Sequence, residues 1–269
     1  MRIFTTALLL SAALCAAAIN YKLTPDVPYH PGGDSYATER CKVDVYAPTD
    51  TAGLPVVLWF HGGGLTGGNK KVPAELKNAG LVVVAANYRL LPEVPIDSCI
   101  ADAARAVAWT FANAEKYGGD PGKIFVAGHS AGGYLTSMVG LDKKWLAPYG
   151  IDPDSIRALA PYSGQMITHF ALRKSKGISE LQPTIDEYAP LFHIRPDCPP
   201  FIIITGDRNE ELYGRHEEDA YMWRMMKLTG HPAVYLYELD GYNHGAMAKP
   251  AHHILKKHIK QILAPANDK

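Results

Sequence analysis

The chain has 269 residues, 47% of them hydrophobic, which is enough apolar material for a large buried core and excludes intrinsic disorder as a description of the whole chain. Its 27 lysines and arginines balance its 27 aspartates and glutamates. No charge excess therefore favours nucleic acid or an anionic membrane surface as a partner.

The first 18 residues have the pattern of a secretory signal peptide. An arginine at position 2 precedes the apolar residues 7–14, and three alanines then form an Ala-x-Ala cleavage site. The apolar stretch is too short to predict a spanning helix, and a buried N-terminal helix is the alternative. Cys15 raises the further alternative of a lipoprotein, which the bulky Leu14 before it disfavours. We expect residues 1–18 to be a signal peptide and the mature chain to be secreted or periplasmic.

Residues 19–40 are polar and rich in proline and glycine, so we expect an irregular N-terminal arm there, followed by one domain over residues 41–269. Residues 41–48 alternate like a half-buried antiparallel strand. Continuous apolar runs, typical of parallel strands covered on both faces, occupy residues 56–60, 81–86, 124–127 and 201–205. Helical patterns occupy residues 72–78, 96–117, 134–141 and 217–228. The alternation predicts an α/β fold with a doubly wound, mostly parallel sheet.

The pattern Gly-x-Ser-x-Gly surrounds Ser130, between the apolar run at 124–127 and a helical pattern rich in small residues. In this context the pattern predicts a tight strand-to-helix turn that exposes the serine hydroxyl as a nucleophile. Its glycines allow a close approach of backbone that a side chain would block. A second motif, His-Gly-Gly-Gly at residues 61–64, directly follows the run at 56–60. A plain glycine turn is the alternative, but the serine motif that follows in the sequence disfavours it.

A serine nucleophile needs a base, and His244 is the candidate among eleven histidines. It lies in a glycine-bounded loop after the strand-like residues 234–238. By contrast, the histidines at positions 252, 253 and 258 lie in a terminal helical pattern and are read as ordinary helix residues. A carboxylate to orient the imidazole should follow the run at 201–205. The candidates in that loop are Asp207, Glu211 and Glu210, in this order of preference, and each could instead pair with a neighbouring arginine.

Residues 163–200 lack strand-like runs and contain several aromatic residues, so we interpret them as a cap segment over the pocket. The alternative is a surface excursion that buries only its own aromatic side chains. Three cysteines follow the signal peptide: Cys41, Cys99 and Cys198. Their odd number supports no disulfide framework and their spacing matches no metal site, so we expect small buried side chains and no metal.

Together with residues 87–93 and 117–121, these motifs resemble those of α/β-hydrolase fold carboxylesterases of the hormone-sensitive-lipase-like and feruloyl/acetyl esterase type. The resemblance covers nearly all of residues 41–269, which it implies to be an α/β-hydrolase domain. It also implies Gly63, Gly64 and Ala131 as backbone donors of an oxyanion hole. The chain departs from many relatives at Asn209, where they carry the acidic residue.

The activity implied by the resemblance is hydrolysis of small or medium acyl esters through an acyl-enzyme at Ser130, without metal or organic cofactor. Acetylated or feruloylated carbohydrates are one substrate class consistent with the resemblance and with export. Two alternatives stay open. A serine peptidase of the same fold could use the same residues, and a non-catalytic binding module could have lost its acid at Asn209. The sequence does not predict the oligomeric state.

Overall fold

The computed structural model describes residues 19–265, so the predicted signal peptide lies outside the described residues. Within them, the strands are β1 (Tyr21–Pro28), β2 (Lys42–Pro48), β3 (Leu54–Phe60), β4 (Val82–Ala86), β5 (Gly119–His129), β6 (Ala158–Tyr162), β7 (Phe201–Gly206) and β8 (Val234–Leu239). The α-helices are α1 (Ser35–Arg40), α2 (Ile96–Asn113), α3 (Ala131–Leu141), α4 (Phe170–Ser175), α5 (Arg215–Leu228) and α6 (Ala248–Leu263). Short 3-10 turns are η1 (Ala74–Leu76), η2 (Glu115–Tyr117), η3 (Lys143–Trp145), η4 (Ala147–Tyr149), η5 (Pro153–Ser155) and η6 (Pro190–His193).

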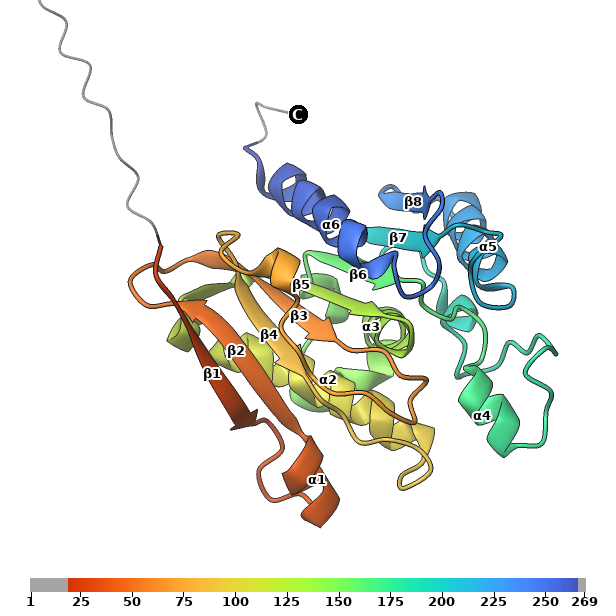
Figure 1. The fold of residues 1–269 in the computed structure, drawn as a ribbon, viewed down its shortest axis with the longest axis horizontal. Helices are drawn as coiled ribbons and strands as arrows, with labels where there is room; N and C mark the ends of the chain where they lie inside the picture. Colours follow the sequence, from red (N-terminus) through yellow and green to blue (C-terminus); the bar gives the residue numbers. More distant parts are fainter. Residues whose placement is uncertain (1–18, 266–269) are drawn as a thin grey trace, which may run out of the picture.

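The strands form one sheet in the order β1-β2-β4-β3-β5-β6-β7-β8 (Figure 1). Strands β4 to β8 pair in parallel with β3 or with one another, whereas β1 and β2 are antiparallel to their neighbours. The order requires crossovers on both sides of the sheet, which is the predicted doubly wound arrangement. The predicted α/β class and mostly parallel sheet are confirmed.

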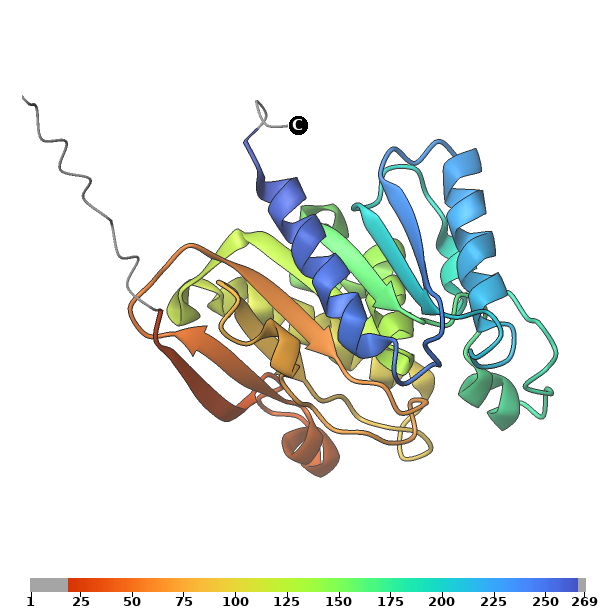
Figure 2. The same ribbon diagram turned by 45° about the horizontal axis from the view of Figure 1, so that its top comes forward.

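Helices cover both faces of this sheet (Figures 1 and 2). Because alternate residues of a strand face opposite sides, β3 contributes to two cores. Val56 and Leu58 pack with α2, α3 and α5, whereas Val57 and Trp59 pack with α6 and η1. The last five of the seven residues of β3 are buried, which explains the continuous apolar run.

Three expectations about elements are corrected. Residues 19–40 are not irregular, because β1 pairs with the edge of β2 and the ring of Tyr21 stacks on Tyr46 at 4.8 Å. Residues 72–78 form only the single 3-10 turn η1, which begins after Pro73. Strand β6 is absent from the predicted elements. Pro161 lies inside it, and proline cannot donate to a sheet ladder, so its sequence does not read as a central strand.

The described cysteines are free and buried, as expected. In the part of the chain from residue 19 to 265, none of the helices combines the length and apolar character needed to cross a bilayer.

Candidate active site

Ser130 occupies the sharp turn between β5 and α3, at the carboxyl edge of the sheet. Its backbone has φ 56° and ψ −116°, a conformation that a non-glycine residue adopts only when its surroundings impose it. Its N–H donates to the carbonyl of Tyr162 at 2.8 Å, and its own carbonyl accepts from Tyr134 at 3.0 Å as α3 begins. The hydroxyl is thereby held above the end of β5, as the motif predicts.

The glycines of the motif allow this turn to pack against the sheet. A Cβ at Gly128 would lie 2.4 Å from the carbonyl group of Gly132, so strand and helix approach each other with no room for a side chain. A Cβ at Gly132 would lie 2.1 Å from the carbonyl oxygen of Phe60, on the neighbouring strand. Both positions therefore require glycine for the elbow to form.

His244 reaches Ser130 from the loop between β8 and α6, as expected. Its Nε2 lies 2.9 Å from the Ser130 hydroxyl, which is the geometry of a base that can accept the serine proton. His129 fixes this loop, because its Nε2 lies 2.7 Å from the backbone oxygen of His244. Burial, and then the neighbouring His244, lower the pKa of His129 to about 4. The neutral His129 ring therefore donates this hydrogen bond.

The carboxylate that contacts His244 is Glu211, the second candidate, and not Asp207. Glu211 Oε2 lies 2.8 Å from His244 Nδ1. Asp207 instead accepts the backbone N–H groups of Asn209 and Gly241, each at 2.8 Å, and so ties the two loops together. The preference for Asp207 as the partner of the imidazole is therefore corrected.

The reason for this difference is local backbone geometry. The N–H of Glu211 donates to the carbonyl of Asp207 at 2.9 Å, which closes one helical turn after β7 and carries Glu211 back toward the histidine loop. Glu210 is exposed on the outside of the same turn, and the amide of Asn209 contacts Asp207 at 3.2 Å. No periodic sequence pattern specifies so short a turn.

Glu211 lies in a pocket of donors that favour its ionised form. Burial alone would raise its pKa, but hydrogen bonds from His244, Ser163 and the Gly206 N–H outweigh burial and lower its pKa from 4.5 to about 2. The Gly206 N–H donates to Oε1 at 3.0 Å, and a Cβ on Gly206 would lie 2.9 Å from that oxygen. Since the carboxylate is ionised, the His244 Nδ1 carries the proton between them and Nε2 is free to accept from Ser130.

Ser163 is a residue of this site that the sequence reasoning missed. Its hydroxyl donates to Glu211 Oε1 at 2.6 Å and lies 3.0 Å from His244 Nδ1. Its φ of 46° is in the left-handed region, and the buried guanidinium of Arg215 donates to its carbonyl. The signal was hidden because Ser163 directly follows β6, the strand that was not predicted.

The His-Gly-Gly-Gly loop passes directly beside the serine. A Cβ at Gly62 would lie 3.2 Å from the Cβ of Ser130. Gly63 has φ 118°, and a Cβ there would lie 2.2 Å from the carbonyl oxygen of Gly67, so only glycine fits. Ala131 is the first residue of α3, where backbone N–H groups have no partner within the helix. The glycine loop and the start of α3 thus both lie next to Ser130.

A cleft of about 980 Å³ lies near this loop, although no residue of the loop lines it. It runs from Thr66 between the chain at residues 91–97 and α4, and its walls are largely apolar. Phe170 borders it, and a Cβ on Gly64 would lie 3.0 Å from the tip of that ring. Phe170 also lines a smaller cavity of about 200 Å³, together with Arg215. Residues 170–172 and 174–176, Glu187 and Tyr188 of the predicted cap segment thus line the larger cleft, and the cap itself stays a prediction.

Among the described residues, one group could supply three ligands to a metal ion: His30, Cys41 and Asp102. Arg89 already bonds both carboxylate oxygens of Asp102, at 2.8 Å each. Burial raises the pKa of the Cys41 thiol to about 12, which disfavours the thiolate that binds metals. The group is therefore better described as an ion pair between Arg89 and Asp102, with His30 and Cys41 beside it.

The sheet topology and the serine elbow define an α/β-hydrolase fold. Residues 43–154 match the family model described as BD-FAE. Over 268 aligned residues the chain is 28% identical to the probable carboxylic ester hydrolase LipM of Mycobacterium tuberculosis, covering 87% of this chain and 61% of that protein. Esterase LipC of the same organism is 27% identical over 82% of this chain and 62% of its own length. The chain thus spans about three fifths of the length of these relatives.

Solved structures support the same fold. A carbohydrate esterase from gut microbiota, in truncated form, superposes with a TM-score of 0.71 at 16% identity, over 91% of this chain and 97% of that one. The esterase of Pyrobaculum calidifontis gives 0.68 at 23% identity, over 90% and 83%. These comparisons confirm the resemblance to α/β-hydrolase fold carboxylesterases.

Proposed function

We propose that the chain is a serine hydrolase that cleaves carboxylic esters through an acyl-enzyme at Ser130. The observation that carries the proposal is the chain of two hydrogen bonds, 2.9 Å from Ser130 to His244 and 2.8 Å from His244 to Glu211. This arrangement is what an alcohol nucleophile requires at neutral pH, namely a base to take its proton and a carboxylate to orient that base.

In the proposed reaction, Ser130 attacks the ester carbonyl while His244 Nε2 takes its proton. The negative charge that forms on the carbonyl oxygen is met by the backbone N–H groups of Gly63, Gly64 and Ala131. The C–O bond to the alcohol breaks, and the alcohol leaves with the proton from His244. Water then attacks the acyl group with His244 again as base, which releases the acid and restores Ser130. Glu211 stabilises the imidazolium in both steps.

We infer that the substrates are small or medium acyl esters, including acetyl or feruloyl esters of carbohydrates. The cleft supports this inference, because its lining combines apolar residues with polar ones. Leu91, Pro92 and Phe170 would contact a short acyl or aromatic group, and Asp97 and Tyr188 would contact hydroxyl groups. The likeness to a carbohydrate esterase from gut microbiota agrees with it.

Glu211 bears on the alternative of a non-catalytic binding module. That alternative rested on Asn209 and a missing acid, and Glu211 supplies a carboxylate on His244. The choice of substrate distinguishes an esterase from the alternative, a serine peptidase. Purified chain should hydrolyse p-nitrophenyl acetate and butyrate but not a peptide p-nitroanilide, and Ser130→Ala should abolish ester turnover. Ser155→Ala, an exposed serine remote from these contacts, is the matched control and should retain full activity.

Acetylated xylan, methyl ferulate and simple acyl glycosides then define the substrate class. Release of acetate or ferulate at rates that depend on Ser130 supports the carbohydrate ester proposal. Turnover of p-nitrophenyl esters with none of these three would leave ester hydrolysis in place and contradict the finer proposal. Turnover of the peptide amide alone would favour a peptidase.

A further inference from the structure

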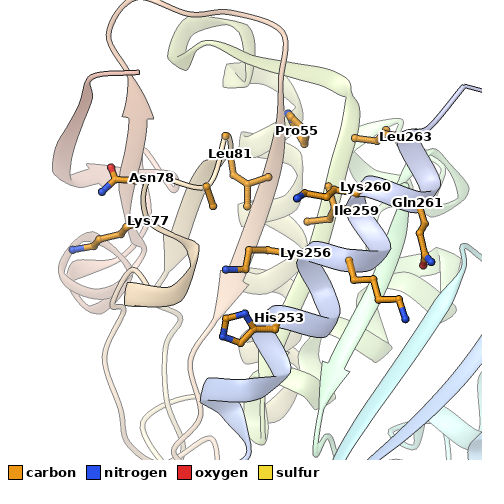
Figure 3. A pocket seen from close by; sticks show the side chains of 13 residues that line it. Pro55, Lys77, Asn78, Leu81, His253, Lys256, Ile259, Lys260, Gln261 and Leu263 are labelled. Carbon is orange, nitrogen blue, oxygen red and sulfur yellow. The ribbon is translucent and has the colours of Figure 1, made fainter. Parts of the chain in front are cut away.

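Two grooves flank α6 at the opposite edge of the sheet from Ser130. The first, of about 910 Å³, is lined by Pro55 and Leu81, which lie at the amino ends of β3 and β4 (Figure 3). The second, of about 640 Å³, lies on the other side of α6 at the amino ends of β6 and β8. Lys257 and Gln261 line both grooves, so the two form one surface across the helix.

This surface is positively charged although the whole chain is balanced. Its cations are Lys77, Lys256, Lys257, Lys260 and Arg157. Neither lining contains an aspartate or glutamate, in a chain with as many acidic as basic residues. Within residues 19–265 none of these five cations forms an ion pair, and α6 carries no acidic residue. Lys256 also donates to the backbone oxygen of Glu75 at 2.8 Å, and Lys77 lies over the Tyr46 ring. The exposed Lys257, Lys260 and Arg157 are therefore the charges that favour an anionic ligand.

The shape of the surface favours a chain-like ligand over a bilayer. Its most buried apolar residues, Leu81 and Ile259, are each 3% exposed and so cannot insert into a membrane. In Figure 3 the side chains of Lys256 and Lys260 extend from α6 toward the first groove, whereas those of Lys77 and Asn78 point away from α6, where they contact Tyr46. The lysines of α6 can each meet an anionic group of a strand lying along the helix.

The remaining lining residues suit a sugar polymer. Gln261, on the ridge between the grooves, can donate to and accept from hydroxyl groups. Tyr235 lines the second groove and is 40% exposed, so its ring offers a flat apolar face together with a phenolic hydroxyl. An anionic polymer that also presents hydroxyls and apolar sugar faces matches this combination.

We propose that the two grooves along α6 bind an extended acidic polysaccharide, with carboxylate or sulfate groups on the lysines. The site is independent of the ester-hydrolysing centre, because Ser130 lies at the carboxyl ends of the strands and the grooves lie at their amino ends. Binding there would leave the active-site cleft open, and would hold the protein on a polymer while Ser130 acts on esters nearby. This last consequence rests on the proposed function, whereas the binding itself does not.

The test uses the chain as Ser130→Ala, so that binding is measured without turnover. Fluorescently labelled oligogalacturonate, a heparin oligosaccharide and a neutral xylo-oligosaccharide are titrated by anisotropy at low salt and at 0.5 M salt. We expect saturable binding of at least one acidic oligosaccharide, none of the neutral one, and marked weakening at high salt. The carboxylated and sulfated probes distinguish the two anion chemistries.

Lys257→Gln/Lys260→Gln should raise the Kd of the acidic oligosaccharide about tenfold, since it removes two partly exposed charge contacts. The matched control is Lys22→Gln/Lys249→Gln, which removes two exposed lysines outside both linings and should leave the Kd unchanged. In the wild-type background both double variants should hydrolyse p-nitrophenyl acetate at the normal rate.

Three results would overturn the proposal. They are no saturable binding of either acidic oligosaccharide, equal weakening by the test and control variants, and tighter binding to phosphatidylserine vesicles or single-stranded DNA than to both oligosaccharides. Loss of esterase activity in Ser130→Ala is separate, so a failed glycan site and a failed ester-hydrolase assignment give different patterns.

Discussion

Replacing Glu211 by glutamine should reduce turnover of p-nitrophenyl acetate by about four orders of magnitude, the effect of losing a triad carboxylate. The structure gives the size of the lost interaction. At an effective dielectric constant of about 20, unit charges at the 2.8 Å separation of Glu211 and His244 attract by about 6 kcal/mol. A loss of about 10⁴ in rate corresponds to about 5.4 kcal/mol, so the contact is large enough to account for it. Glutamine can also donate to Nδ1, which would leave the proton on Nε2, facing Ser130.

The assay is kcat/KM for p-nitrophenyl acetate, with Asp207→Asn as the matched control from the same loop. Asp207 holds the backbone of Asn209 and Gly241, so we expect Asp207→Asn to lower the melting temperature but to retain more than a tenth of the activity. Circular dichroism verifies that each variant is folded. A folded Glu211→Gln variant with more than a tenth of wild-type activity would refute the reasoning. A 10⁴ loss of activity in Asp207→Asn would instead assign to Asp207 the role of the carboxylate that orients His244.

Three further outcomes are expected. Ser163→Ala should lower kcat by about 10- to 100-fold with little change in KM, because it removes a hydrogen bond to an ionised carboxylate; an unchanged kcat would contradict this positioning role. Gly132→Ala should fail to fold or lose several degrees of melting temperature, because its Cβ would lie 2.1 Å from the Phe60 oxygen, whereas Gly122→Ala meets only a side-chain oxygen at 3.2 Å and should be tolerated; equal melting temperatures would contradict the steric argument. Burial lowers the pKa of His252 to about 3, so below pH 6.5 the unfolded chain binds a proton that the folded chain does not, and stability falls as the pH drops. Between pH 7 and pH 5 this one histidine should remove about 2 kcal/mol of unfolding free energy, and His252→Phe should show a correspondingly shallower loss in chemical denaturation; the same slope as wild type would assign the effect elsewhere.

The central sheet could be predicted from the sequence because strands buried on both faces leave continuous apolar runs. The same is true of the serine elbow, where close backbone contacts at Gly128 and Gly132 force glycine at fixed spacing. Strand β6 left no such signal, since its five residues include Pro161 and two alanines. β1 was missed because its pairing with β2 satisfies the backbone whatever its side chains are.

The serine, the histidine and the glycine loop were predicted because each follows a recognisable strand. The acid was not, because the choice among Asp207, Glu210 and Glu211 depends on a single turn of backbone hydrogen bonds, which sequence patterns do not encode. Ser163 was hidden for a similar reason. The signal peptide and the secreted or periplasmic location stay predictions.

The central claim is that His244 and Glu211 make Ser130 a strong nucleophile, and covalent labelling tests it most directly. We predict that a fluorophosphonate probe will modify this chain once, on the peptide that contains Ser130, as read by mass spectrometry, and that Ser130→Ala will not react. A folded wild-type chain that stays unlabelled, or that is labelled at another residue, would contradict the account.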